Sequence, residues 1–237
     1  MVSINTALCS FGMSGLVFHA PFIEAHPGFN LYGVWERSAK TAQEKYPDIH
    51  SFDTLEEMLA DELIELVVVN TPNYTHFDFA KKALLAGKNV LVEKSFTVTV
   101  REAEELIILA NEQGKKLAVF QNRRYDSDFK TVQKIIKSGQ LGNIIEAEFH
   151  FDRFKPTLSP KTHKETLTPG AGLLHDLGPH LVDQAIFLFG MPQSLSGHLK
   201  ITRPLSLVND YMDVLLFYPL LTVRLKAGYL VKEPLPS

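Results

Sequence analysis

This sequence of 237 residues has little of what a membrane protein, a nucleic-acid-binding protein or a disulfide-stapled domain requires. A single cysteine, Cys9, excludes an intrachain disulfide framework and a cysteine-rich metal site, and it fits a reducing compartment. The formal net charge of -3 provides no global positive field for nucleic acid. The longest apolar runs, 63–69 and 214–221, are far shorter than the roughly 18 residues of a membrane-spanning helix. We therefore expect a cytoplasmic protein with no membrane and no nucleic-acid partner.

The overall amino-acid composition is that of a globular protein. Hydrophobic residues make up 45% and charged residues 22% of the chain, which suits one large domain or two modest ones. Up to about residue 122, short apolar runs alternate with amphipathic segments. This alternation predicts a parallel sheet with strands at 4–8, 29–35, 63–69, 89–92 and 117–120, and helices at 14–24, 39–45, from 55, 76–86 and 100–112.

Beyond residue 122 the pattern changes. It predicts helices at 129–137 and 173–189, a strand at 144–151, and three further strands near 195–201, 210–217 and 221–227. Strands in succession indicate antiparallel pairing. We therefore predict an α/β fold: a Rossmann-type, doubly wound domain over 1–122, followed over 123–237 by an α+β domain with a largely antiparallel sheet.

Three predicted helices begin with a threonine that precedes a carboxylate by three residues. The pairs are Thr54 with Glu57, Thr75 with Asp78, and Thr99 with Glu102. This spacing is typical of a helix start at which the threonine oxygen caps a backbone N–H group.

A glycine-containing turn follows the first predicted strand and overlays the dinucleotide pattern G-x-G-x-x-G. Two of its three glycines are present, because Ser10 stands in the first position. Gly12 would let a pyrophosphate approach the backbone, and Gly15 would let the helix pack closely on the strand. A tight turn without a ligand would look similar. The candidate cofactor contacts in this turn are Ser10, Phe11, Gly12, Met13, Ser14 and Gly15.

The second predicted strand ends in polar residues that could face a ribose. Glu36 lies 21 residues after Gly15, close to the offset of about 20 that is expected of a ribose-binding acid. Arg37 and Ser38 add a cation and a hydroxyl where a 2′-phosphate would sit. We expect NADP as the preferred cofactor, and Glu36 leaves NAD as the alternative.

Polar residues also follow the other predicted parallel strands, whose carboxyl ends share one edge of the sheet. Lys94 comes directly after the apolar segment 90–92 and Glu93, and a cation at the mouth of a buried strand is well placed to face a ligand. The remaining candidates at this edge are Thr71, Pro72, Asn73, His76 and Asn122.

The second domain contains an aspartate and a histidine at helical spacing. Asp176 and His180 are four residues apart in the predicted helix, so the carboxylate could support the imidazole as a base. A surface pair without function would have the same spacing. A metal site that includes His163 and His175 is a weaker alternative, since no H-E-x-x-H or facial carboxylate pattern is present.

These motifs together resemble the glucose-fructose oxidoreductase, inositol dehydrogenase and rhizopine-catabolism (Gfo/Idh/MocA) family. The segments that carry the resemblance are 11–15, 17–21, 71–73 with His76, 93–94, 122–124 and 176–180. The resemblance implies a nicotinamide-dependent oxidoreductase acting on a polyol, inositol or sugar. The glycine-containing loop is most similar to that of NADP-preferring members that act on inositols.

The resemblance also implies roles for individual residues. Lys94 would contact the reacting hydroxyl and the cofactor, Asp176 would position the substrate, and His180 would be the general acid/base. Asn122 and Arg153 are further candidate substrate contacts. Family members often dimerise through the second-domain sheet, so a homo-oligomer is expected.

The sequence departs from the family pattern at two places. Ser95 replaces the family's proline, and because a cis bond before a residue other than proline costs about 2.5 to 4 kcal/mol, we expect a trans bond after Lys94. Family members also continue well beyond the equivalent of Ser237, so we expect a shortened second-domain sheet with an unpaired edge. Both departures leave open a non-catalytic nucleotide-binding or sensor module as the alternative to a dehydrogenase.

Overall fold

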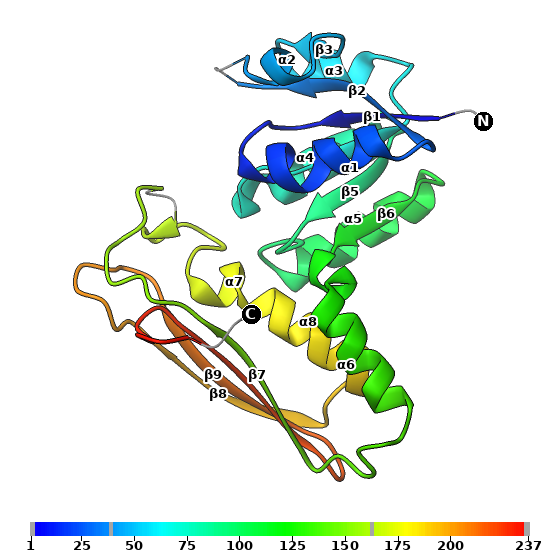
Figure 1. Cartoon of the computed structure of the whole chain (residues 1–237). Coiled ribbons are helices and arrows are strands. Elements are labelled where there is room, and N and C mark those ends of the chain that lie inside the picture. Colours follow the sequence, from blue (N-terminus) through cyan, green and yellow to red (C-terminus); the bar gives the residue numbers. More distant parts are fainter. Residues whose placement is uncertain (1–2, 38–39, 162–163, 235–237) are drawn as a thin grey trace. The chain divides into compact units, whose positions relative to one another are not determined.

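The computed structural model describes residues 3–37, 40–161 and 164–234 (Figure 1). It divides the chain into two compact units, residues 1–120 and 121–237. Each unit has its own β-sheet and its own hydrophobic core.

The first unit contains a parallel sheet, which confirms the predicted fold class. Its strand order in the described residues is β3-β2-β1-β4-β5-β6, and each neighbouring pair is parallel. The order reverses between β1 and β4, which is the switch point where doubly wound sheets bind ligands. The strands are β1 (Ile4–Leu8), β2 (Phe29–Trp35), β3 (His50–Phe52), β4 (Leu66–Val69), β5 (Asn89–Glu93) and β6 (Leu117–Phe120).

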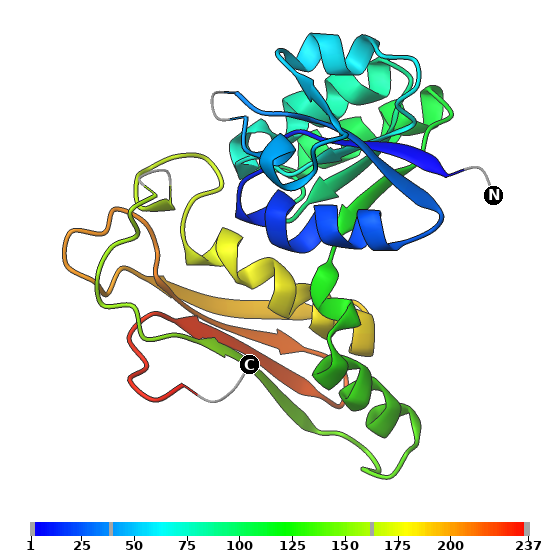
Figure 2. The same ribbon diagram turned by 45° about the horizontal axis from the view of Figure 1, so that its top comes forward.

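Helices cover both faces of this sheet (Figures 1 and 2). On one face Ala20 and Ala42 pack near Leu8 and Val68, and on the other Met58, Leu84 and Leu106 pack with Val67 and Val69. Burial on both faces explains why the central strand β4 is continuously apolar. The helical segments are η1 (Gly15–His19, a π-helical turn), α1 (Ala20–Ala25), α2 (Ala42–Lys45), α3 (Leu55–Ala60), η2 (Asn73–Thr75), α4 (His76–Leu85) and α5 (Val100–Glu112).

Two of the three predicted helix caps are confirmed. Thr54 Oγ1 accepts a hydrogen bond from the Glu57 N–H at 3.0 Å, and Thr99 forms a reciprocal capping box with Glu102. Thr75 does not cap α4 in this way, because its hydroxyl donates to the Pro72 carbonyl at 2.7 Å within the preceding η2 turn.

The second unit contains a mixed sheet on which α8 packs. Its strand order is β7-β10-β9-β8; β9 is antiparallel to both neighbours, whereas β7 runs parallel to β10. Leu181 and Ala185 of α8 lie in the same core as Val223 and Leu225. The elements are η3 (Asn122–Tyr125), α6 (Ser127–Lys137), β7 (Glu146–Asp152), α7 (Leu173–Asp176), α8 (Gly178–Phe189), β8 (Ser194–Lys200), β9 (Tyr211–Phe217) and β10 (Thr222–Gly228).

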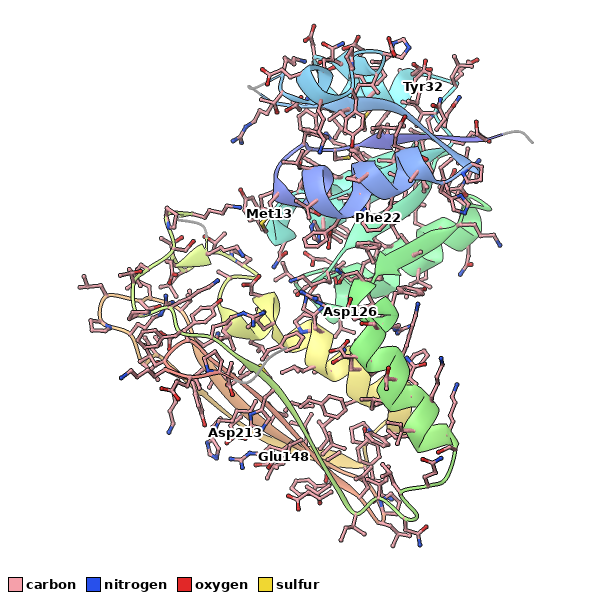
Figure 3. The ribbon with its side chains drawn as sticks, in the orientation of Figure 1. Met13, Phe22, Tyr32, Asp126, Glu148 and Asp213 are labelled. Atoms are coloured by element: carbon pink, nitrogen blue, oxygen red, sulfur yellow. The ribbon has the colours of Figure 1, made fainter. Side chains whose placement is uncertain are left out.

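The other face of this sheet carries a ladder of charged side chains. The Arg224 guanidinium lies 2.7 Å from Asp213 Oδ2 and 3.6 Å from Glu148 Oε1, so it joins β10 to both neighbouring strands. Figure 3 shows Glu148 and Asp213 on this sheet. Such cross-strand ion pairs each contribute at most about 1 kcal/mol when they are exposed to water.

The predicted single helix over 173–189 is two helices, α7 and α8. Pro179 lacks the N–H group that would bond to the carbonyl four residues earlier, so a continuous helix is disfavoured at this point. Gly178 fits because a Cβ atom there would lie 3.2 Å from Leu174 Cδ1 and 3.4 Å from the Met212 sulfur. The break falls at Leu177, between Asp176 and His180, and the backbone at Leu177 keeps right-handed helical dihedral angles.

A buried ion cluster stabilises the loops of the second unit. The Arg203 Nε atom donates to Asp210 Oδ2 at 2.9 Å, and Nη2 donates to Glu165 Oε2 at 2.8 Å. All three side chains are buried, with exposed fractions of 4% for Arg203, 7% for Glu165 and 0% for Asp210. Although burial alone would raise the pKa of Asp210, hydrogen bonds from Arg203 and Thr202 outweigh it and hold that pKa below its usual value.

Among the described residues, no helix is both long enough and apolar enough to cross a membrane.

Replacing the buried arginine is expected to destabilise the second unit strongly. Arg203→Met leaves two buried carboxylates without their cation, and breaking such a cluster costs about 3 to 5 kcal/mol. The control is Arg224→Met, whose ion pairs are exposed to water and screened by it, so its loss of stability should be much smaller. Urea unfolding of both variants measures the difference, and equal losses of stability would contradict the role given to Arg203.

The same cluster predicts how stability depends on pH. Because the folded-state pKa of Asp210 lies below its unfolded value of about 3.9, its contribution is complete above that pH and is lost as the pH falls through the folded-state pKa. Asp210→Asn should therefore flatten the fall in unfolding free energy below about pH 4. Urea titrations of wild type and variant at pH values from 2 to 6 test this, and parallel curves would contradict it.

Candidate functional site

The turn after β1 is tied to the end of β4 by a reciprocal pair of hydrogen bonds. Ser10 Oγ donates to the Asn70 carbonyl at 3.1 Å, and Asn70 Nδ2 donates to the Ser10 carbonyl at 2.9 Å. Ser10, which replaces the first glycine of the pattern, thus links the two strands at the switch point. Asn70 was not among the predicted site residues, because no local sequence pattern indicates a contact with a residue 60 positions earlier.

The two glycines of this turn have different surroundings. A Cβ atom on Gly15 would lie 2.5 Å from the Ser10 carbonyl oxygen and 3.0 Å from Asn70 Nδ2, so Gly15 is required for packing. A Cβ atom on Gly12 would meet no atom within 4 Å. Met13 projects outward from the same turn with 61% of its surface exposed (Figure 3). The backbone at Gly12 is therefore open to a ligand, as a pyrophosphate would need.

A cavity of about 400 Å³ lies beside the turn. Its lining combines apolar side chains from the turn and η1 with polar and charged side chains from α2 and its N-cap: Phe11, Leu16, Thr41, Glu44 and Lys45. Apolar walls with a few polar groups are typical of cofactor sites. The cavity and the open backbone at Gly12 lie on the same turn and leave room for a ligand beside it.

Glu36 accepts hydrogen bonds from the segment that begins α2. One carboxylate oxygen accepts from the Thr41 N–H at 3.2 Å and from Thr41 Oγ1 at 2.8 Å, and the other accepts from the Ala42 N–H at 2.9 Å. The side chain is buried and holds the start of α2, and its contact with a ribose stays a prediction. Arg37 is exposed, and Ser38 lies outside the described residues.

Glu93 links the lysine loop to the phosphate-loop turn. Its Oε1 atom accepts from Ser14 Oγ and lies 2.9 Å from His19 Nε2, while Oε2 accepts from the Lys94 N–H at 3.2 Å. Burial would raise the pKa of Glu93, but the hydrogen bonds from His19 and Ser14 outweigh it and keep the pKa below its ordinary value. Glu93 is therefore an ionised carboxylate at neutral pH, and its bonds are internal to the unit.

His76 connects two of the predicted loops. Its Nδ1 atom lies 2.7 Å from the Ser95 carbonyl oxygen, and Nε2 lies 2.8 Å from the Thr71 carbonyl oxygen. The side chain is 0% exposed, and this burial lowers its pKa. Because the ring is enclosed and both nitrogens face backbone carbonyls, His76 links these loops, and its contact with a cofactor stays a prediction.

Lys94 follows β5 directly, at the carboxyl edge of the parallel sheet. The bond between Lys94 and Ser95 is cis, so the expectation of a trans bond was wrong. That expectation used only the local cost of the bond, whereas the loop is held by contacts with distant residues, through Glu93 and through the Ser95 carbonyl.

The segment after β4 forms the η2 turn. Thr71 Oγ1 and Thr75 Oγ1 lie 2.7 Å apart, and the Thr75 N–H donates to the Pro72 carbonyl at 2.9 Å. Asn73 begins the turn and is half-buried, whereas Pro72 is exposed. These residues, the phosphate-loop turn and Lys94 all belong to one sheet edge.

In the second unit, the Asp176 carboxylate accepts hydrogen bonds from two side chains. Its Oδ1 atom accepts from Lys164 Nζ at 3.1 Å, and Oδ2 accepts from the Tyr229 hydroxyl at 3.2 Å. The Arg203 guanidinium lies 4.7 Å from the Tyr229 ring centre, so Tyr229 connects Asp176 to the buried ion cluster. Burial raises the pKa of Tyr229, as does the neighbouring Asp176 carboxylate, which keeps the hydroxyl protonated as a donor.

His180 lies in the first turn of α8 and is 7% exposed. Its ring centre is 6.0 Å from that of Phe151, and the Arg153 guanidinium lies 5.9 Å from the same Phe151 ring. His180 and Arg153, both predicted site residues, are therefore neighbours of one aromatic side chain. Asn122 begins η3 and is half-buried.

Among the described residues, no three His, Cys, Asp or Glu side chains are arranged to hold a metal ion. His163, which the weaker metal hypothesis included, lies outside the described residues.

Family models match both halves of the chain. A model described as "Oxidoreductase family, NAD-binding Rossmann fold" matches residues 4–121, and one described as "GFO/IDH/MocA C-terminal domain" matches residues 129–235. The chain belongs to the Gfo/Idh/MocA oxidoreductase family. The resemblance inferred from the motifs is thereby confirmed.

Individual members of the family are similar over nearly the whole chain. An uncharacterized oxidoreductase of Schizosaccharomyces pombe is 46% identical over 227 residues, which cover 92% of this chain and 61% of the relative. The scyllo-inositol 2-dehydrogenase (NADP(+)) of Bacillus subtilis is 33% identical over 97% of this chain and 64% of its own length. The structure of GenD2 from gentamicin A biosynthesis, in complex with NAD, is 26% identical, with a TM-score of 0.89 over 99% of this chain and 68% of that one. The chain thus spans less than two thirds of the length of both curated relatives.

Membership in the Gfo/Idh/MocA family gives the open turn at Gly12 its expected ligand, a nicotinamide dinucleotide. Of the predicted cofactor contacts in the turn 10–15, Phe11 lines the cavity. Glu36, Glu93 and His76 instead form hydrogen bonds within the first unit. His19, which completes the bonds of Glu93, was not among the predicted site residues, since a pairing across 74 positions leaves no sequence signal.

The two glycines should respond differently to substitution by alanine. Gly15→Ala would force its Cβ atom against backbone, and we expect a loss of about 1 to 3 kcal/mol in unfolding free energy. Gly12→Ala should leave stability within about 0.5 kcal/mol of wild type and weaken NADPH binding, because the new methyl group stands where the pyrophosphate approaches. Thermal unfolding and NADPH fluorescence titration measure the two effects, and unchanged NADPH affinity in Gly12→Ala would contradict the assignment.

Proposed function

We propose that this protein is an NAD(P)-dependent oxidoreductase that transfers hydride between nicotinamide and a secondary alcohol of a polyol, inositol or sugar. The observation that carries the proposal is the bond between Ser14 and Glu93, since it joins the open phosphate-loop turn to the loop that bears Lys94. A dinucleotide bound at the turn and a cation at the end of β5 are then parts of one sheet edge.

In this proposal, side chains of the protein stabilise the developing charge, accept the proton and position the substrate. Lys94 stabilises the negative charge that develops on the substrate oxygen, His180 accepts the hydroxyl proton, and Asp176 positions the substrate. Such acid/base help contributes about 10²- to 10⁴-fold in rate. The nicotinamide supplies the hydride acceptor. Asn122 and Arg153 are proposed as further substrate contacts.

We also propose NADP as the preferred cofactor. The Glu36 carboxylate accepts hydrogen bonds from Thr41 and Ala42 through both oxygens, so it is not placed to bind a free 2′-hydroxyl. Arg37, next to it, is exposed and can pair with a 2′-phosphate. The Bacillus subtilis relative is named as an NADP(+)-dependent dehydrogenase, while the GenD2 structure is a complex with NAD.

An alternative is a nucleotide-binding or sensor module without turnover. It is favoured by Ser10, which occupies the first glycine position and bonds to Asn70. NADPH binding without oxidation of any compound in a polyol and sugar panel would support this alternative.

Two further expectations stay proposals. The charged face of the second-unit sheet, with Arg224 between Glu148 and Asp213, is the surface through which we propose a homo-oligomer.

A single buried cysteine, whose pKa is raised to about 12 by burial, suits a reducing compartment such as the cytoplasm.

Substitution of the proposed catalytic residues should remove turnover and spare cofactor binding. Lys94→Ala and His180→Ala are each expected to lower kcat at least about 100-fold, because they remove charge stabilisation and the proton acceptor. The control is Lys134→Ala on the exposed side of α6, which should match wild type. Steady-state rates and NADPH titration decide, and unchanged rates in both variants would refute the proposal.

Cofactor preference should depend on Arg37 and not on the charge of Glu36. Arg37→Ala is expected to weaken NADPH binding about 10- to 100-fold and leave NADH binding unchanged, because only the 2′-phosphate is affected. Glu36→Gln should lower the melting temperature by weakening the start of α2, with the preference retained. Arg101→Ala, an exposed arginine of α5, is the control. A changed ratio of NADPH to NADH affinity in the Glu36→Gln variant would contradict this account.

A further inference from the structure

We propose that two buried histidines, His19 and His76, are positioning residues that hold the Lys94 loop from opposite sides and couple it to the phosphate-loop turn. The inference rests on the proposed function, since it gives these residues a part in the same reaction. Neither histidine touches the reacting groups in this account. His19 acts through the side chain of Glu93, and His76 acts through the backbone carbonyl of Ser95.

The first side of the loop is held through Glu93. His19 Nε2 lies 2.9 Å from Glu93 Oε1, and the His19 side chain is 2% exposed while that of Glu93 is 13% exposed. Ser14 Oγ donates to the same oxygen, and the other oxygen accepts the Lys94 N–H. With a carboxylate on one side and the ring of Phe120 at 4.4 Å on the other, His19 is fixed to the ends of both β5 and β6.

The second side of the loop is held through His76. Its two ring nitrogens lie within 2.8 Å of two backbone carbonyl oxygens, those of Ser95 and Thr71. Carbonyl oxygens only accept hydrogen bonds, so the neutral ring, which has one N–H group, donates to one of these two carbonyls and lies in close contact with the other. His76 therefore lies between the loops after β4 and β5 and contacts both of them from inside the core.

The two contacts enclose the single residue Lys94 between Glu93 and Ser95. Ser14 and His19 belong to the turn and helix that would meet the dinucleotide phosphates, so a change at that turn is transmitted to Lys94 through one carboxylate. A misplacement of about 1 Å at a reacting group can cost about 100-fold in rate. The arrangement thus explains how a lysine on a loop can be held accurately enough for catalysis.

The experiment compares His19→Leu, His76→Leu, the smaller change Ser14→Ala, the donor-retaining His19→Gln, and the control His26→Gln at an exposed site. Hydrogen exchange of the peptide covering 93–97 is measured in the cofactor-free protein, beside NADPH affinity, kcat and KM. We expect exchange in this peptide to rise about tenfold or more in both leucine variants, with kcat falling about tenfold or more and NADPH affinity changing less than about threefold. Ser14→Ala should show a smaller change of the same kind.

Several outcomes separate this inference from a general loss of stability. His19→Gln should recover part of both effects, because its amide can donate to Glu93, and His26→Gln should match wild type. Exchange that is unchanged in 93–97, or raised equally throughout residues 3–120, would overturn the inference. If wild type binds NADPH but oxidises no polyol or sugar, the proposed oxidoreductase function fails, while the exchange data still decide whether the histidines hold the loop.

Discussion

The parallel pairing of β4 with both β1 and β5 is the constraint on which the candidate site depends. It brings the carboxyl ends of three strands to one edge, where Ser10 meets Asn70 across 60 positions and Ser14 meets Glu93 across 79. The register is held by strand residues buried on both faces, such as Val68 and Val90. If one strand slipped by a residue, each of these polar contacts would point to the wrong face.

In both units, the cost of burying a carboxylate is offset by hydrogen-bond donors that lie close to it. Glu36 and Glu93 accept hydrogen bonds within the first unit, and Arg203 satisfies two carboxylates within the second. A buried carboxylate without such donors would be too costly to keep ionised. Some residues that look like ligand contacts in the sequence thus have hydrogen-bond partners within the fold, whereas the backbone at Gly12 and the side chain of Arg37 are open to solvent.

The predicted strands of the first unit were recognisable because each is an apolar run long enough to stand out. β3 was missed since its three residues show no alternation. The helix predicted over 173–189 ignored the missing N–H of Pro179, and the Thr75 cap was lost to the short η2 turn. These errors arise where one local signal competes with another over a few residues, and tertiary contacts decide the result.

From the sequence alone, the βαβ order, the glycine-containing turn, the lysine at the end of a buried strand and the family could be determined, because these depend on patterns between neighbouring residues. Only the tertiary structure decided that Glu36 holds α2, that Glu93 bonds to Ser14 and His19, and that the Lys94–Ser95 bond is cis. Each of these depends on atoms that the chain brings together from distant positions, and a hydrogen bond between such positions leaves no local pattern in one sequence.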